Sequence, residues 1–451
     1  GFETTLWTGV SGLRAAQKQL EVAAHNISNV NTPGFSRQRV EIEPSHPGPG
    51  AYGVRGDGQM GTGVTIADVI RMRNELTDVA YWSEAGSAAG AQTRAEVLGR
   101  AEMVLGPLGG GVPEALSKFW TSWDDLSLNG TDAGARQGVL DAGKTLAAQL
   151  RSSASQVDRL TEETGLAVTE TVSEINQLAQ KAAELNQAIK ESVVAGQSPN
   201  DMMDRRDAVV DKLAALVGGT ARPGEHGTVD VYVSNRALVR GSDFETMKAR
   251  TDGTFGAQWT IDDKIIASGG KLGALTELAN TTLPGIRAEL DAFALGMRDL
   301  INTAHQAGFD QDGAAGVAFF TGTDAGNIDL NASMTGRKLA ASAGGAAVDA
   351  GNALNIAGLR TALAVGPETL QQAMQSLAGR LGSLAATAKS TADSSRQVLD
   401  NMSGERAQMS SVSTDEELAD IVRFQHAYEA AAKVIQVVDS CMDTLINVVG
   451  R

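Results

Sequence analysis

Apolar residues recur at alternating steps of three and four near both ends of this chain. One stripe runs over residues 6–27 and the other over residues 421–449. Such spacing keeps apolar side chains on one narrow face of an α-helix, the pattern of a coiled coil. We therefore expect two long terminal helices that pack on each other; two amphipathic helices on a globular core are the alternative. The expected seam consists of Leu6, Val10, Leu13, Leu20, Ile27, Ile421, Phe424, Tyr428, Ile435, Val438, Met442, Leu445 and Val449.

Local signals place one end of each terminal helix. Pro33 and Gly34 follow the first stripe and stop a helix, and the asparagine-rich residues 26–31 favour fraying and turns just before them. Thr414 and Glu417 have the spacing of a capping box, which predicts that the last helix begins there.

Between the ends, helical periodicity dominates the chain. It is clear over residues 132–195, 273–305 and 368–409, which predicts long antiparallel helices in a rod-like domain. Residues 228–233 instead alternate as a half-buried strand, and further strand-like pieces follow up to Gly270. A small antiparallel β domain is therefore expected between the helices.

These patterns predict an elongated, mainly α protein with three domains. The terminal coiled coil takes residues 1–40 plus 412–451, the helical rod 41–217 plus 271–411, and the inserted β domain 218–270. Within the rod, residues 308–358 are rich in Gly and Ala and should be irregular. The first half leads out and the second returns, so both chain ends should lie together, with the β domain farthest from them.

Composition excludes several classes of function. The net charge is −16 over 451 residues, whereas binding nucleic-acid phosphates requires clustered Lys and Arg. No apolar run is long enough to span a bilayer, so no membrane insertion is expected. Aromatic residues make up only 4%, which leaves few walls for a ligand pocket. The N-terminus does not read as a secretory signal peptide.

Candidate reactive residues are few and scattered. The five histidines never have metal-ligand spacing, and Cys441, the single cysteine, has no base that the sequence places beside it. Residues 56–63 are glycine-rich but lead into an extended segment, whereas a phosphate loop must open a helix. We expect no catalytic, cofactor or metal site, and hence a protein that is not an enzyme.

Longer motifs at both ends resemble one known family. Residues 11–17 and 26–38 resemble the N-terminal signature of flagellar rod, hook and hook-associated proteins, and residues 417–447 resemble the matching C-terminal end. Internally, the Phe119–Leu126 stretch and residues 196–207 resemble the FlgK type of hook-associated protein. Residues 321–358 depart from the family, since larger members have a further β domain there. The family motif residues are Asn26, Asn29, Asn31, Thr32, Gly34, Phe35, Ser198, Pro199, Asn200, Asp201, Arg205 and Asp207.

The resemblance implies a structural protein that joins the flagellar hook to the filament. Such a protein is exported unfolded by the type III route without a cleaved signal, and assembles outside the cell as an eleven-subunit layer. Implied partners are further copies of itself, the hook protein FlgE, the hook-associated protein FlgL and the chaperone FlgN. A hook protein or other axial protein is the alternative within the class. A secreted enzyme or adhesin using axial ends is the alternative outside it, and would need a catalytic constellation or a large surface domain.

Overall fold

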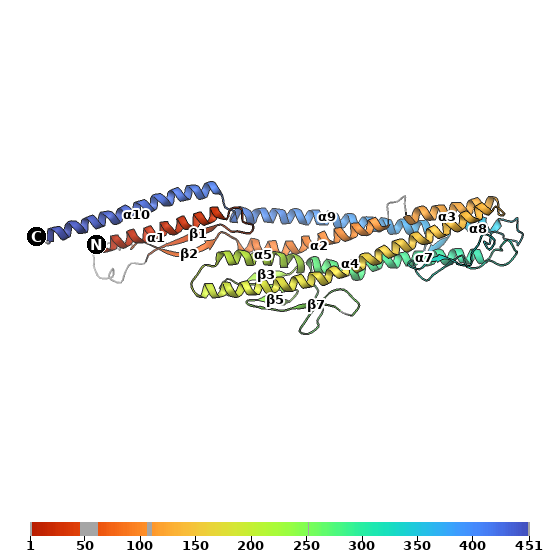
Figure 1. The fold of residues 1–451 in the computed structure, drawn as a ribbon, viewed down its shortest axis with the longest axis horizontal. Helices are drawn as coiled ribbons and strands as arrows, with labels where there is room; N and C mark the ends of the chain where they lie inside the picture. The colour runs from red at the N-terminus through yellow and green to blue at the C-terminus, as the bar shows by residue number, and fades with distance from the viewer. Residues whose placement is uncertain (1, 46–61, 106–110, 251, 450–451) are drawn as a thin grey trace.

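The computed structural model describes residues 2–45, 62–105, 111–250 and 252–449. Its shape is elongated, and both chain ends lie at the same end (Figure 1). The fold is mainly α with a few small antiparallel sheets, which confirms the predicted fold class.

The terminal unit contains two long helices side by side, α1 and α10, at the end that carries both termini (Figure 1). An antiparallel hairpin, β1 with β2, packs on α1, and the register pairs Val40 with Val69. Their bounds are α1 (Phe2–Ser28), β1 (Gln38–Pro44), β2 (Val64–Arg71) and α10 (Thr414–Val449).

The rod is built from long helices. α2 and α9 run side by side from the terminal unit outward, and α4 is 62 residues long, about 90 Å at 1.5 Å per residue. Asp132 caps α4 by accepting a hydrogen bond from the Ala135 amide at 2.9 Å. The helices are α2 (Glu75–Leu105), α3 (Gly111–Leu128), α4 (Ala133–Val194), α5 (Asn200–Val217), α6 (Gly270–Glu277), α7 (Leu283–Gln306), α8 (Gly351–Gly358) and α9 (Leu370–Ser410).

A π-helical turn, η2 (Leu278–Thr282), joins α6 to α7, so the helix predicted over residues 273–305 is one rod with a widened turn inside it. The 3₁₀ turns are η1 (Glu225–Gly227) and η3 (Leu359–Thr361). The predicted helices over 132–195 and 368–409 are confirmed as α4 and α9 within two residues at each end.

The β unit, residues 218–270, contains a sheet in the order β3-β4-β5-β6 and a second pair, β7 with β8. It packs on the second half of α4, on α5 and on α6, and shares one apolar core with them. The unit therefore lies midway along the molecule, and the expectation that it is farthest from the termini is wrong (Figure 1). Its strands are β3 (Thr220–Pro223), β4 (Val229–Val233), β5 (Arg236–Arg240), β6 (Asp243–Phe244), β7 (Met247–Ala249) and β8 (Ala257–Trp259).

The end opposite the termini is the tip, formed by α3, the far end of α7 and residues 308–358 (Figure 1). Those residues are irregular apart from two short strands and α8, the helix that takes their last eight positions. Phe119, Trp123, Phe319 and Phe320 are almost fully buried there and contact one another ring to ring. The irregular stretch thus covers a real core. The short strands near it are β9 (Phe320–Thr321), β10 (Asp329–Leu330), β11 (Leu363–Val365) and β12 (Glu368–Thr369).

Candidate functional site: the joint between the terminal helices and the rod

α1 and α10 approach each other closely through glycines. A Cβ added at Gly9 would lie 2.9 Å from Ile435 Cγ1, and one added at Gly12 would lie 3.7 Å from Ala431 Cβ. A Cβ contact under 3.0 Å requires something to shift, so Gly9 sets the spacing of the two helices. Sequence reasoning placed Ile435 in the seam but overlooked the glycines that face it.

The expected seam residues lie along this helix pair with different degrees of burial. Val438 is buried, with 6% of its surface exposed, whereas Tyr428, Met442 and Leu445 are exposed by 39–45%. The side chain of Val449 lies outside the described residues. The remaining members are half-buried: Leu6, Val10, Leu13, Leu20, Ile27, Ile421, Phe424 and Ile435.

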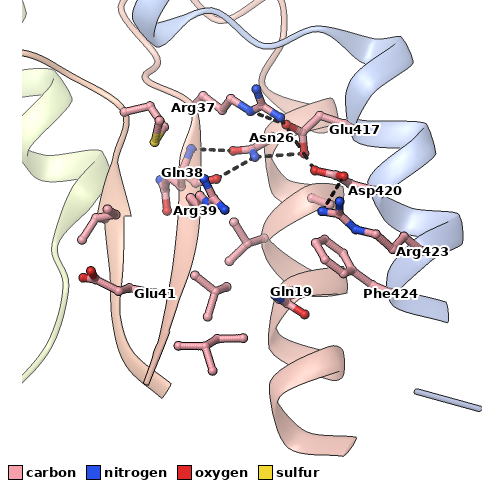
Figure 2. A pocket seen from close by; sticks show the side chains of 16 residues that line it. Gln19, Asn26, Arg37, Gln38, Arg39, Glu41, Glu417, Asp420, Arg423 and Phe424 are labelled. Carbon is pink, nitrogen blue, oxygen red and sulfur yellow. Dashed lines mark hydrogen bonds and ion pairs between the residues drawn. The ribbon is translucent and has the colours of Figure 1, made fainter. Parts of the chain in front are cut away.

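The C-terminal end of α1 is clasped to both β1 and α10 by one asparagine (Figure 2). The Asn26 amide donates to the Gln38 carbonyl at 3.0 Å and accepts from the Gln38 amide at 3.0 Å. The same Nδ2 also donates to Glu417 Oε2 at 3.1 Å. Both Asn26 and Glu417 are buried. Asn26 therefore joins three segments, one of which is about 390 residues away in the sequence.

Arg37 supplies the positive charge that buried Glu417 requires. Arg37 Nε lies 2.6 Å from Glu417 Oε1, and Nη1 lies 2.8 Å from Glu416 Oε2. Burial opposes the charge of Arg37, but these carboxylates outweigh it and raise the pKa of the guanidinium. The capping box expected from Thr414 and Glu417 is not formed, because the Glu417 side chain turns to Arg37 and Asn26 instead. The Glu416 amide lies 3.5 Å from Ser413 Oγ.

A groove of about 640 Å³ lies beside this clasp, between α1, the β1–β2 hairpin and the first turns of α10 (Figure 2). Apolar residues such as Val22 and Val40 line it together with Arg39, Asp420 and Arg423. Asp420 and Arg423 pair with each other at 2.8 Å.

The internal family motif meets the N-terminal motif at the same joint. Asn200 Nδ2 donates to the Val69 carbonyl at 2.6 Å, and Asp201 Oδ1 accepts from Gln38 Nε2 at 2.9 Å. α5 begins at Asn200, and the Ser198 hydroxyl just before it donates to Asp68 on β2. The turn before α5 is therefore fastened to the β hairpin.

Asp204, one turn along α5, holds the loop after α1. Its carboxylate accepts from the Ser36 amide at 2.8 Å and the Ser36 hydroxyl at 2.7 Å. Arg71 Nη1, at the end of β2, lies 2.8 Å from Asp204 and 2.7 Å from Asp207. Three elements that are distant in sequence thus share one buried charge cluster.

Asp207 is the centre of that cluster. Burial raises the pKa of a carboxyl group, but Arg206, Arg71 and Arg73 surround Asp207 and lower its pKa on balance. Arg206 is itself buried and bonds Asp207, Asn186 and the Gly227 carbonyl. The motif residue chosen from the sequence, Arg205, is exposed. Sequence reasoning therefore missed Arg206, since two adjacent arginines give no sign of which one faces inward.

The cluster continues onto the long helices α2 and α9. Arg73 bonds Asp78 at 2.6 Å, and Arg406 of α9 bonds the same carboxylate at 2.8 Å. Arg406 also reaches Asp211 of α5 at 3.3 Å, whose pKa is raised by burial even though Arg406 opposes that shift. The four arginines 71, 73, 206 and 406 balance the four aspartates 78, 204, 207 and 211.

The other motif residues shape the turn after α1. Asn29 donates to the His25 carbonyl at 3.0 Å and accepts from Thr32 at 3.2 Å, while the Phe35 ring packs edge-on against His25. Gly34 has φ +79°, which favours glycine. Asn31 is exposed, and Pro199 is buried at the start of α5.

The joint is built to hold elements together. Among the described residues, no group of three or more His, Cys, Asp or Glu side chains is placed to hold a metal ion. No helix in the described ranges is long and apolar enough to cross a membrane. Cys441 is half-buried on α10, and the glycine-rich residues 56–61 lie outside the described residues. Buried ion pairs and amides that bond at both ends hold the elements they join in one geometry.

Comparisons with known proteins agree along nearly the whole chain. Residues 98–320 match the family described as flagellar hook-associated protein FlgK helical domain. Flagellar hook-associated protein 1 of Bacillus subtilis (strain 168) is 29% identical to this chain. The alignment covers 99% of this chain and 98% of the relative. The corresponding protein of Escherichia coli (strain K12) is 25% identical, with coverages of 97% and 98%. Over nearly its full length, the chain is similar to the flagellar hook-associated proteins of the FlgK family.

Further matches cover the two terminal segments of the chain. Residues 6–35 match the flagella basal body rod protein family, and residues 405–448 match the C-terminal family of the basal body rod FlgEFG proteins. These segments include most of α1 and nearly all of α10. The fold resembles the flagellar hook junction protein FlgK from Burkholderia pseudomallei, with a TM-score of 0.61 and 15% identity, covering 74% of this chain and all of that one.

Proposed function

We propose that this chain is the structural protein that joins the flagellar hook to the filament, and that copies of it associate through the α1–α10 pair. The family and the mainly α, elongated fold support the first part. The observation that supports the second is that α10 is apolar on two sides, of which α1 covers only one.

The covered side carries Phe424 and Ile435, which belong to the seam with α1. Val422 and Val437 each lie two residues from one of these, roughly 200° around the helix, and are exposed by 53% and 61%. Scattered exposed apolar residues are normal on a surface, but a stripe along a helix that is apolar on both sides indicates burial in an assembly.

A second copy of this chain is the occupant we propose for that stripe. The stripe lies on another side of α10 than the contact with α1, so a second copy can occupy it without displacing α1. Both terminal segments match basal body rod families, which supports a shared element of axial assembly. Burying one valine side chain contributes about 1.5–3 kcal/mol to the association of two copies. The contribution would recur at each valine of the stripe and at each contact between copies.

The finer assignments are also proposals. An eleven-subunit layer, the hook protein FlgE below it, FlgL above it and the chaperone FlgN before export follow from the family resemblance. The family is part of the bacterial flagellum, and we propose an extracellular location after type III export. The curated relatives are structural flagellar proteins, and we propose no catalytic role for this chain.

Deleting the gene and restoring variants tests this proposal. The deletion should leave hooks without filaments and release filament protein into the medium, and the unaltered chain should restore attachment. Val437→Asp should be exported normally but fail to hold filaments, because it places a charge in the proposed contact. Leu166→Asp, a matched change at a position of α4 that is 60% exposed, should restore attachment. Full attachment with Val437→Asp would contradict the assembly surface; attachment in the deletion strain would contradict the function.

A further inference from the structure

Three helical asparagines grip the backbone of the β unit. Asn176 of α4 donates to the Met247 carbonyl at 2.7 Å and accepts from the Met247 amide at 2.8 Å. These two bonds reproduce the pair that a neighbouring strand would form with one residue of an antiparallel ladder. Met247 is the first residue of β7, and its bonds to Asn176 close the edge of that strand.

Asn186, ten residues further along α4, also bonds backbone atoms of the β unit, at the point where β4 and β5 separate. Its Nδ2 donates to the carbonyls of Val229 and Gly241, both at 2.8 Å, and its Oδ1 accepts from the Val229 amide at 3.1 Å. Val231 pairs with Val239 in the ladder, so Val229 and Gly241 would form the next rung. The buried side chain of Asn186 lies between these two residues and bonds both in place of that rung.

Asn280 holds a third point, the loop before β8. Its amide donates to the Phe255 carbonyl at 2.6 Å and accepts from the Phe255 amide at 2.9 Å. Asn280 lies in the π-helical turn η2, where the widened turn interrupts the regular spacing between α6 and α7. The Phe255 ring lies directly on α4 at Gly165, where an added Cβ would meet the ring.

We propose that Asn176, Asn186 and Asn280 are positioning residues that fix the place of the β unit on the rod. The apolar core gives adhesion there but little direction, because the hydrophobic effect is non-directional. Hydrogen bonds depend on direction and distance, so paired amides define a register that apolar contact leaves open. Asn176 and Asn186 are about 15 Å apart along α4. Because they are two separate attachment points, they also fix the orientation of the β unit relative to α4.

The grip is on backbone atoms, so it does not depend on which side chains the β unit presents outward. Its exposed residues, such as Ile261 at 78% and Ile265 at 63%, can vary without loosening the attachment. The same amide pairing recurs at Asn26 with Gln38 and at Asn302 with Phe320, which shows it is a repeated device of this fold.

Distance measurements on the full chain separate positioning from simple stabilisation. In a Cys441→Ser background, spin labels at Glu174→Cys on α4 and Ile265→Cys on the β unit report their separation. Both positions are exposed. The test variant is Asn176→Leu with Asn280→Leu, which keeps side-chain size and removes both pairs of bonds. Gln180→Leu is the control, since Gln180 is an exposed amide of α4 that bonds Glu184 on the same helix.

We expect the double variant to broaden and shift the distance distribution while its melting stays cooperative, and the control to match the parent. The Met247 and Phe255 amides should exchange roughly tenfold faster, as expected for lost hydrogen bonds of ordinary strength. If the double variant unfolds the β unit, the single variants replace it, with the same expected broadening. An unchanged distance distribution in a folded variant, whatever happens to exchange, would overturn the proposal.

Discussion

Acidification should loosen the tip through His305. The side chain is fully buried, its Nδ1 lies 2.6 Å from the Val317 carbonyl, and its Nε2 lies 2.9 Å from the Ala340 amide. An amide can only donate, so Nε2 must accept and the ring must be neutral. Protonation would place two N–H groups face to face and put a charge among the rings of Trp123 and Phe319.

The magnitude follows from the pKa. Burial lowers the pKa of His305 to about 4, against 6.5 for an unfolded chain, although the bond to Val317 and the charge of Asp310 oppose this. The unfolded state therefore binds more protons between these values, so stability is complete above pH 6.5 and falls as the pH drops towards 4. At about 1.4 kcal/mol per pH unit, the full loss is about 3 kcal/mol.

Hydrogen exchange of tip peptides around residues 317–340, followed from neutral pH to about pH 4.5, measures this loss. The matched variant is His305→Gln, which keeps one donor and one acceptor but does not titrate. The parent should lose protection relative to His305→Gln as the pH falls, approaching a factor of about 100 for the full 3 kcal/mol. Parallel pH dependence in the two proteins would refute the assignment.

Two substitutions probe the joint. Asp207→Asn should leave buried Arg206 and Arg71 short of negative charge and lower the free energy of unfolding by about 3–5 kcal/mol, measured by denaturant titration. Asp400→Asn, at an exposed position of α9, is the control, and equal effects of the two would contradict the buried cluster. Gly9→Leu should force α1 and α10 apart, since even a Cβ would lie 2.9 Å from Ile435. Amide exchange in both helices should then accelerate while α4 is unaffected; unchanged exchange in α1 would show that the two helices do not depend on this contact.

The long helices could be predicted because their signals are local. α4 follows a continuous periodicity with Asp132 at its start, and the two heptad stripes are visible in α1 and α10 without any knowledge of the fold. The joint could be predicted only in part. Both family motifs were found separately, but nothing in either shows that Asp201 would reach Gln38 or that Asp204 would reach Ser36.

Sequence reasoning was wrong where a residue or unit had more than one possible place or partner. Glu417 has the spacing of a local capping box, yet Asn26 and Arg37 attract it more strongly, because Asn26 is buried beside it and half-buried Arg37 is charged. The β unit was placed at the wrong point along the molecule, because chain order does not reveal that α7 runs on past it to the tip. The gripping role of Asn176 was also hidden, since an asparagine within a helix is most simply a surface residue.

Thiol labelling of Val437→Cys in a Cys441→Ser background tests the central claim most directly. In the free chain this position is 61% exposed and should label rapidly. In assembled flagella that retain their filaments it should be protected by a neighbouring copy, while Ile261→Cys on the β unit, 78% exposed, serves as the reference for reagent access. Protection of residue 437 with labelling at residue 261 is the predicted result. Equal labelling of residue 437 in the free and assembled states would contradict assembly through the outer face of α10.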